Sequence, residues 1–295
     1  MPGVRDFPIE IEHPVTDVQA YLSSAGGVRP YALAAADFEP LPVGEDRTDV
    51  LAFVNEVPAD ELPPRFAVAF GEGAMAQLRQ WSYRGVPPYA LRIRLRDARW
   101  REQESSEAGF GWAGRRAARE AARCIENDAR PRAYVKRWPA PRTAAFSPPG
   151  HYLPQGWTSP VFHPVRDVHI RLVTASACGV FAIATADFEP LPAGSDLLFE
   201  FECELTDSRL PHEYAEAFEL GVHETLCAAG TGRLPTAAVR VRLHDAKWHP
   251  VDSNERIFIE AGRRAAAEAL RCQTEGGSPV PVDHWPIRGP RPAEA

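Results

Sequence analysis

The chain has 295 residues, of which 44% are hydrophobic and 25% are charged, and its formal net charge is −7. This length predicts about two domains, and the composition is typical of ordinary globular proteins. No apolar run reaches the roughly 18 to 20 residues of a membrane span, and residues 1–14 lack the basic and then apolar pattern of a signal peptide. These features argue against a membrane-spanning class and indicate a cytoplasmic protein.

Three motifs occur twice, in the same order. They are ADFEPLP (36–42 and 186–192), RLRDARW matched by RLHDAKW (94–100 and 242–248), and AGRRAA (113–118 and 261–266). The spacing is 150 residues for the first motif and 148 for the other two. A period this long indicates two domains with one shared fold rather than a solenoid of short repeats.

The sequence pattern predicts the same helices and strands, in the same order, in each half of the chain. An extended opening (17–35 and 168–185) leads into ADFEPLP, and a second strand-like stretch follows (50–57 and 197–205). Prolines then mark the start of a helix, at Leu62-Pro63-Pro64 in the first half and Leu210-Pro211 in the second. The apolar residues that recur at helical spacing are Phe66, Phe70 and Ala74, matched by Tyr214, Phe218, Val222 and Leu226.

The clearest strand signal follows that helix. Leu91, Ile93 and Leu95 alternate with arginines, as do Val239, Val241 and Leu243 with Arg240, Arg242 and His244. Strict alternation predicts one core face and one basic face. A second helix comes next, with Ser105 and Ser106 at its start in the first half, and Asp252 with Glu255 as a carboxylate capping box in the second. Its apolar stripe is narrow: Phe110, Ala113, Ala117 and Ala121, matched by Phe258, Ala261, Ala265 and Ala269.

The repeat sets the predicted domain boundaries. We expect a first repeat over 8–142, a connector rich in proline and aromatic residues over 143–164, a second repeat over 165–288 and a tail over 289–295. The five cysteines are odd in number and lack a CxxC spacing, so free thiols are predicted. Cys124 and Cys272 share one repeat position, which favours a buried site for both.

Charge is distributed unevenly along the chain. Residues 1–83 carry 5 basic and 13 acidic groups, residues 84–142 carry 15 and 7, and residues 143–295 carry 13 and 20. A block of arginines is the usual electrostatic signature of a phosphate-rich partner, although such residues also simply face solvent or pair with acids.

The second half resembles domain IV of the elongation factor G and elongation factor 2 family over 186–226 and 237–270. In that family a strand leads into a Tyr-His-Asp-Val-Asp-Ser-Ser-Glu type of loop and an Ala-Gly-containing helix. The loop reads WHPVDSNE at 248–255 here, and the first half matches it with WREQESSE at 100–107.

The resemblance implies an α+β fold, namely two tandem copies of the left-handed βαβ fold shared with a small-subunit ribosomal protein, each a four-stranded sheet packed with two helices. It also implies ribosome contact through tip loops, where His249 matches the family's tip histidine and Arg101 takes its place in the first copy. The family's Gly-rich second tip loop is reduced here to 177–181 and 25–29. The sequence has no GxxxxGK[ST] phosphate loop, so GTPase activity is not expected.

Two catalytic or metal hypotheses have weaker support. Asp245, His249, Asp252 and Glu255 offer ligand types for zinc or manganese, but their spacing fits no strong signature. A Ser-His-Asp hydrolase would need a nucleophile elbow, and no GxSxG motif is present. We therefore expect no catalytic residue, no metal and no cofactor.

The leading prediction is a nonenzymatic protein that associates with the ribosome or structured RNA and does not bind membranes. Fixed cations suit phosphate contacts, which need no sequence readout. The predicted RNA or partner contact residues are His249, Lys247, Arg101, Arg92, Arg94, Arg96, Arg115 and Arg116. One alternative is a protein-interaction or small-molecule module, such as a target mimic or resistance factor, that keeps only the fold. An enzyme ranks last, because fold alone does not give function.

Overall fold

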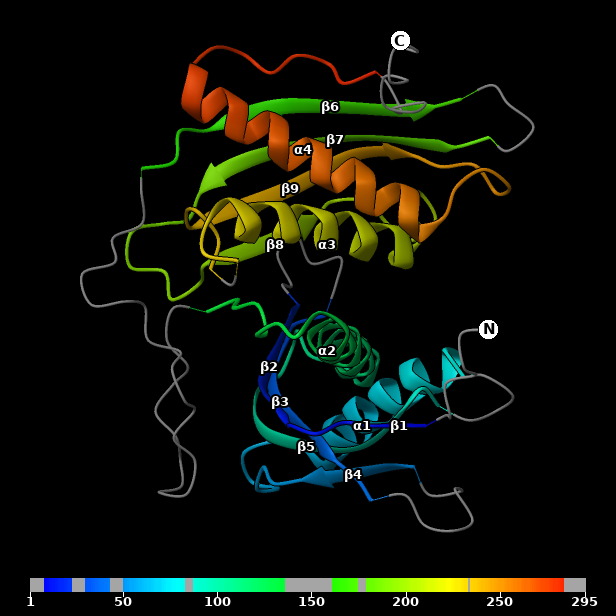
Figure 1. The fold of residues 1–295 in the computed structure, drawn as a ribbon. Helices are drawn as coiled ribbons and strands as arrows, with labels where there is room; N and C mark the ends of the chain where they lie inside the picture. Colours follow the sequence, from blue (N-terminus) through cyan, green and yellow to red (C-terminus); the bar gives the residue numbers. More distant parts are fainter. Residues whose placement is uncertain are drawn as a thin grey trace. The chain divides into compact units, whose positions relative to one another are not determined.

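A computed structural model describes residues 8–22, 30–42, 50–82, 87–135, 161–174, 179–232 and 234–283. The chain divides into two compact units, Met1–Trp157 and Thr158–Ala295. Each unit is a sheet with two helices packed on one face (Figure 1). Most of the predicted connector, and the aromatic residues Phe146, Tyr152 and Trp157 within it, lie outside the described residues.

The first unit has five strands and two helices in the part of the chain that is described. They are β1 (Ile9–Glu10), β2 (Val15–Leu22), β3 (Ala32–Pro40), β4 (Leu51–Asn55), α1 (Pro64–Gln80), β5 (Tyr89–Arg99) and α2 (Glu107–Asn127). Strand β3 pairs antiparallel with β2 and β5, whereas β4 and the short β1 run parallel to β5. The parallel pair β4 and β5 is joined through α1, so it forms a βαβ unit.

The second unit repeats this arrangement. Its elements are β6 (Val165–Val173), β7 (Phe181–Pro190), β8 (Phe199–Cys203), α3 (His212–Ala229), β9 (Val239–Lys247) and α4 (Glu255–Glu275). The strand order β6-β7-β9-β8 matches the order β2-β3-β5-β4 of the first unit. The predicted α+β architecture of two tandem units is therefore confirmed. The extended opening of each half is an antiparallel hairpin, and ADFEPLP lies at the end of its second strand.

The core has the composition that the sequence patterns predict. Leu91, Ile93 and Leu95 are buried, as are Val239, Val241 and Leu243 at the matching places. The stripes Phe110 to Ala121 and Phe258 to Ala269 are fully buried. Large aromatic rings stack between the two helices of each unit, with centroids 4.9 Å apart both for Phe66 with Phe110 and for Tyr214 with Phe258.

Glycines bring the two helices of each unit into close contact. A Cβ on Gly73 would lie 2.0 Å from the Gly111 carbonyl oxygen, and one on Gly114 would lie 2.0 Å from the Phe70 carbonyl oxygen. Gly221 and Gly262 occupy the equivalent places in the second unit, with similar approaches. Side chains at these four positions would push the helices apart, so the small residues set the spacing of the helix layer.

The second helix of each unit is capped by a side chain just before it. Ser106 accepts a hydrogen bond from the Gly109 N–H, and Asn254 accepts one from the Ile257 N–H. The prediction that Asp252 and Glu255 form a capping box is therefore wrong. Asn254 is the residue whose oxygen reaches the third N–H of the helix, which is the usual N-cap geometry.

An aspartate with positive φ begins the hairpin in each unit. Asp17 has φ 63° and Asp167 has φ 57°, and the pairing register of β2 and β6 shifts at these positions. The N–H of each donates to an aspartate on the next strand, to Asp37 at 2.7 Å and to Asp187 at 2.8 Å. The hydrogen bond helps offset the cost of this unusual backbone conformation.

The cysteines of the described segments are free and buried, namely Cys124, Cys203, Cys227 and Cys272. This agrees with the free thiols predicted at these positions. Among the helices that the structure describes, none is both long and apolar enough to cross a membrane.

Candidate functional site

The loop between the last strand and the last helix of each unit is held in place by the same hydrogen bonds. In the first unit the Arg101 N–H donates to Ser105 Oγ at 2.9 Å, and that hydroxyl donates to the Tyr31 carbonyl at 2.7 Å. The Tyr31 N–H returns a bond to the Glu104 carbonyl at 2.7 Å. We call this loop, residues 100–106 with Tyr31, the first tip.

The second tip, residues 248–254 with Phe181, has the same bonds. The His249 N–H donates to Ser253 Oγ at 2.8 Å, which donates to the Phe181 carbonyl at 2.6 Å. The Phe181 N–H donates to the Asp252 carbonyl at 2.9 Å. Both tips are thus fixed to the start of the neighbouring strand by one serine hydroxyl and one backbone hydrogen bond, while the side chains of Arg101 and His249 stay about half exposed.

The first tip presents a guanidinium group over an aromatic ring. The Arg101 guanidinium carbon lies 4.2 Å from the centre of the Tyr31 ring, and Nη1 lies 2.8 Å from Glu104 Oε2. Burial raises the pKa of Tyr31, although Arg101 and Arg99 act in the opposite direction. The tyrosine is therefore a neutral platform that holds the arginine in one orientation.

The second tip presents an imidazole group instead. His249 Nδ1 lies 3.0 Å from Asp252 Oδ2, while the N–H groups of Val251 and Asp252 approach it only at 3.4 and 3.3 Å. Lys247 ends β9 beside this loop and is exposed. Both tips can therefore donate hydrogen bonds or stack, but an acid three residues on partly neutralises each of them.

The open face of the first sheet carries mixed charge. Arg94 pairs with Glu39 at 2.7 Å and also with Glu56, and Arg96 lies 2.9 Å from Glu56 and 3.6 Å from Asp37. The expectation of a basic face therefore needs correction. Strand β3 and the residue just after β4 supply acids that the pattern along β5 alone does not reveal.

Arg92 differs from the other strand arginines. Its register partner on β4 is Ala52, whereas the matching Arg240 lies opposite Glu200 and 2.7 Å from its carboxylate. Within the described segments Arg92 has no ion pair, so it is the unneutralised cation of this face.

The two predicted contact arginines on α2 differ in exposure and in their partners. Arg115 is exposed on α2, whereas Arg116 donates to the Tyr21 carbonyl at 2.7 Å and so ties the helix to the hairpin. In the second unit, the matching Arg263 and Arg264 pair with glutamates, at 2.9 Å in each case. Within the first unit, the six predicted contact residues are therefore divided among the tip, the sheet face and helix α2.

Three groups escaped the sequence analysis. Tyr31 and Phe181 form the aromatic platforms of the tips, and their shared repeat position is a signal that could have found them. Glu120 and Glu268 anchor the segment after the last helix of their units. Asp167, Asp187 and His244 come together on three strands. By contrast, no metal-sized cluster forms in the described segments from Asp245, His249, Asp252 and Glu255.

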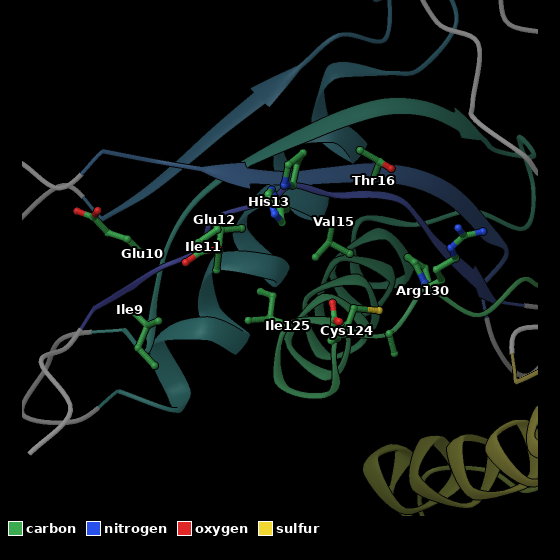
Figure 2. A pocket seen from close by; sticks show the side chains of 14 residues that line it. Ile9, Glu10, Ile11, Glu12, His13, Val15, Thr16, Cys124, Ile125 and Arg130 are labelled. Carbon is green, nitrogen blue, oxygen red and sulfur yellow. The ribbon is translucent and has the colours of Figure 1, made fainter. Parts of the chain in front are cut away.

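A groove of about 430 Å³ lies in the first unit between residues 9–16 and 124–131 (Figure 2). Ile125 lines it. At the matching place in the second unit, Gln273 accepts from the His163 N–H at 2.9 Å and donates to its carbonyl at 2.5 Å, so a side chain fastens the segment there. The two copies thus differ at this place in the side chain after the shared cysteine, Ile125 in the first unit and the hydrogen-bonded Gln273 in the second.

The fold and the two tips define a class of protein made of paired α+β modules, each with a loop exposed at the end of its sheet. The family described as elongation factor G, domain IV, matches residues 9–124 and 177–272. Because these matches cover well over half of the chain, one in each copy, the chain belongs to the elongation factor G domain IV family.

A curated relative is elongation factor G of Petrotoga mobilis, which is 36% identical over 83 residues. That match covers 28% of this chain and 12% of the relative, so the two share a small part of that factor's length. A crystal structure of a Thermus thermophilus protein aligns at 18% identity over 34% of this chain and 16% of that one, with a TM-score of 0.26. That likeness adds nothing to the family assignment.

Proposed function

We propose that this protein is a nonenzymatic, cytoplasmic factor that associates with the ribosome or with structured RNA through its two domain-IV-like tips. The observation that carries the proposal is the repeated tip scaffold. In each copy, the same two hydrogen bonds of a serine hydroxyl fix the loop, and the loop's planar, hydrogen-bonding side chain lies near an aromatic ring. Arginine and histidine in such a setting can contact phosphates or stack on unpaired bases.

The proposal gives the first tip the larger share of the binding. Arg101 is permanently charged, whereas His249 is charged only when it holds two protons. Because phosphate binding depends on fixed cations, the first tip should dominate the salt-dependent part of the affinity.

Co-sedimentation with 70S ribosomes over a range of salt concentrations tests this proposal. We expect wild-type protein to pellet at low salt and to be released as salt increases. Arg101→Ala should weaken the association and reduce the slope of log K against log salt by roughly 0.7 to 0.9 for each phosphate that the variant no longer binds. His249→Ala should have the smaller effect.

Arg79→Ala is the matched control, because it removes one exposed charge from α1, outside the tip. Equal losses of affinity for Arg79→Ala and Arg101→Ala would mean that overall charge, not the tip, drives binding. Absence of pelleting by the wild type even at low salt would rule out the ribosome proposal. A protein-interaction or small-molecule module would then be the function to pursue, consistent with the acids that neutralise most strand arginines.

A further inference from the structure

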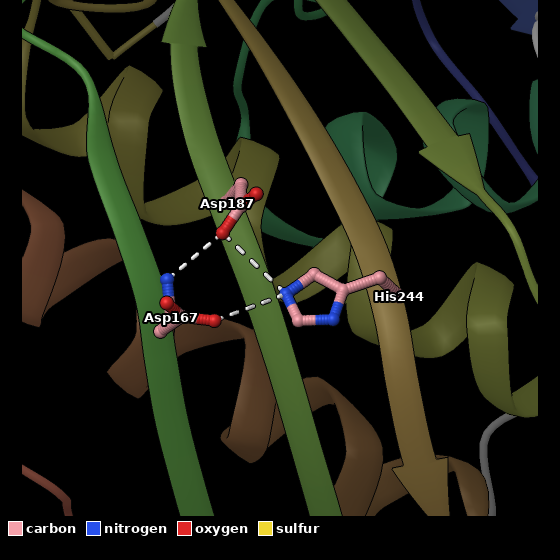
Figure 3. A group of neighbouring side chains, drawn as sticks. All are labelled: Asp167, Asp187 and His244. Atoms are coloured by element: carbon pink, nitrogen blue, oxygen red, sulfur yellow. Dashed lines mark hydrogen bonds and ion pairs between the residues drawn. The ribbon is translucent and has the colours of Figure 1, made fainter.

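Asp167, Asp187 and His244 lie together on the open face of the second sheet. They come from β6, β7 and β9, and Figure 3 shows both carboxylates directed at the imidazole. His244 Nε2 lies 3.4 Å from Asp187 Oδ1 and 3.8 Å from Asp167 Oδ1. This nitrogen is shielded from solvent and has no hydrogen-bond partner among the residues that the structure describes.

The three candidate ligand atoms lie within 4.8 Å of one another, and the shortest of their distances, 3.4 Å between Asp187 and His244, suits two ligands of one ion. Two ligands with bonds of about 2.1 Å to a tetrahedral centre lie roughly 3.4 Å apart, because the angle between them is about 109°. Asp187 is already oriented, since its Oδ1 accepts the Asp167 N–H at 2.8 Å. The Asp167 side chain is 82% exposed and has room to close the longer gap.

In the first unit, a positive charge lies at the place that corresponds to this cluster. Its aspartates Asp17 and Asp37 match Asp167 and Asp187, and Arg96 matches His244. Arg96 Nε lies 3.6 Å from Asp37 Oδ2, so a permanent cation lies beside the Asp37 carboxylate there. A neutral histidine cannot supply that charge, but it can supply a nitrogen lone pair to a metal ion.

We propose that the second repeat binds a divalent transition ion of the zinc class through Asp167, Asp187 and His244 Nε2. The ion takes the electrostatic role that the Arg96 guanidinium has in the first repeat. Imidazole with carboxylates is a ligand set for zinc, and three protein ligands leave a position for water. The site is independent of the tips and does not rest on the ribosome proposal.

The competing explanation is an ion pair with a doubly protonated His244. The nearby basic side chains on the same face do not provide another cation for the cluster, because Arg166 pairs with Glu189 and Arg242 pairs with Glu189, Glu202 and Glu204. A protonated histidine would bind no metal, so titration with an ion separates the two explanations.

The test is calorimetric titration of the metal-free full chain with zinc chloride near pH 7.5, repeated with Co²⁺ to follow ligation by visible absorption. We expect one ion per chain at this site. His244→Arg, which reproduces the first repeat, should abolish the binding while leaving the thermal unfolding temperature near that of the wild type. Asp167→Asn should weaken binding by at least about 10-fold.

Asp245→Asn is the matched control, because Asp245 lies next to His244 on β9 but outside the cluster. It should bind zinc like the wild type. Absence of zinc binding by the wild type would overturn the proposal. Binding that is unchanged in His244→Arg would also overturn it, because the ion would then sit elsewhere, for example on a cysteine thiolate.

Discussion

The two repeats keep one scaffold but differ in their charge chemistry. The tip hydrogen bonds, the close helix contact at glycines and the stacked aromatic pair recur almost unchanged. The side chains on the sheet and helix surfaces do not recur. Buried packing therefore constrained both copies equally, whereas the surfaces were free to diverge.

On α3 and β8 the second copy has more acids than the matching elements of the first copy, although Glu72 of α1 is matched by Leu220. The four glutamates of α3 stand where α1 has other residues: Arg65, Val68, Gly71 and Ala76 match Glu213, Glu216, Glu219 and Glu224. On the sheets, Ala52 and Val54 match Glu200 and Glu202. Under the proposed association with the ribosome or RNA, phosphate contact should belong mainly to the first copy.

The largest expected effect comes from Glu120, which anchors the segment after α2. Its carboxylate accepts the Arg132 N–H at 2.7 Å and pairs with the buried Arg132 side chain and with Arg123. Burial acts to raise its pKa, but the hydrogen bonds and charges of both arginines hold the pKa at about 2. Glu120→Gln should lower the free energy of unfolding by about 3 to 5 kcal/mol, because Arg132 stays buried without its counterion.

Glu268 is the matched control. It accepts the Val280 N–H at 2.6 Å and pairs with Arg271, but the position of Arg132 is taken by the exposed Val280. Glu268→Gln should therefore cost less than Glu120→Gln in urea unfolding. The stability that the ionised Glu120 carboxylate contributes is fully present above about pH 4.5, the pKa of this group in the unfolded chain. It is lost as pH falls towards 2, the pKa in the folded protein. Equal losses of stability for the two variants would contradict this account.

The second-largest effect is expected at the glycines that bring the two helices of each unit into close contact. Gly73→Ala should destabilise the first unit by about 1 to 3 kcal/mol, since its Cβ would lie 2.0 Å from the Gly111 carbonyl oxygen. Gly111→Ala is the control in the facing helix, where the nearest atom would be 3.7 Å away. That change should stabilise α2 by up to about 1 kcal/mol. Hydrogen exchange of the α1 and α2 amides would measure the stability change in both variants. A loss of stability in Gly111→Ala would argue against the close contact of α1 and α2 at Gly73.

A smaller, pH-dependent effect is expected at Asp37. Burial raises the pKa of this carboxyl to about 6, although Arg96 acts to lower it. Because the folded value exceeds the unfolded value of 3.8, the stability that this group contributes is highest below pH 3.8 and falls as pH rises to about 6. The full change is at most about 3 kcal/mol.

Asp37→Asn should remove that decline, and its amide oxygen can still accept the Asp17 N–H. The measurement is the difference in unfolding free energy between wild type and variant from pH 4 to pH 7. The wild type should lose stability relative to the variant as pH rises. A difference that is flat or has the opposite slope would show that Arg96 outweighs burial at this carboxyl.

Periodicity and repetition were enough to predict much of the fold. The alternation along 91–95 and 239–243, and the alanine stripes of the last helices, report burial directly, because they depend on which face of an element meets the core. The cap of the last helix was predicted at Asp252 rather than Asn254, because several polar residues in a row satisfy the same pattern. Cap geometry then decides among them.

The surfaces were harder to predict, because their charges pair across strands. The arginines of β5 read as a basic face along the sequence, yet Glu39 and Glu56 come from other segments and neutralise two of them. The Asp167, Asp187 and His244 cluster was hidden for the same reason, since its members lie far apart in the chain. Only the strand register brings such groups together.

The smallest effect is expected from a substitution that makes the charge on the first sheet resemble that on the second sheet. Ala52→Glu would place a carboxylate opposite Arg92, as Glu200 lies opposite Arg240. Such a cross-strand pair should raise the unfolding free energy by only about 0.2 to 1 kcal/mol. If the first copy contacts RNA, neutralising Arg92 should also reduce the salt slope of ribosome co-sedimentation by somewhat less than about 1. Ala52→Gln, which adds similar bulk without charge, should leave that slope unchanged. A gain in stability with an unaltered slope would remove the sheet face from the contact and leave the tip as the binding surface of the first copy.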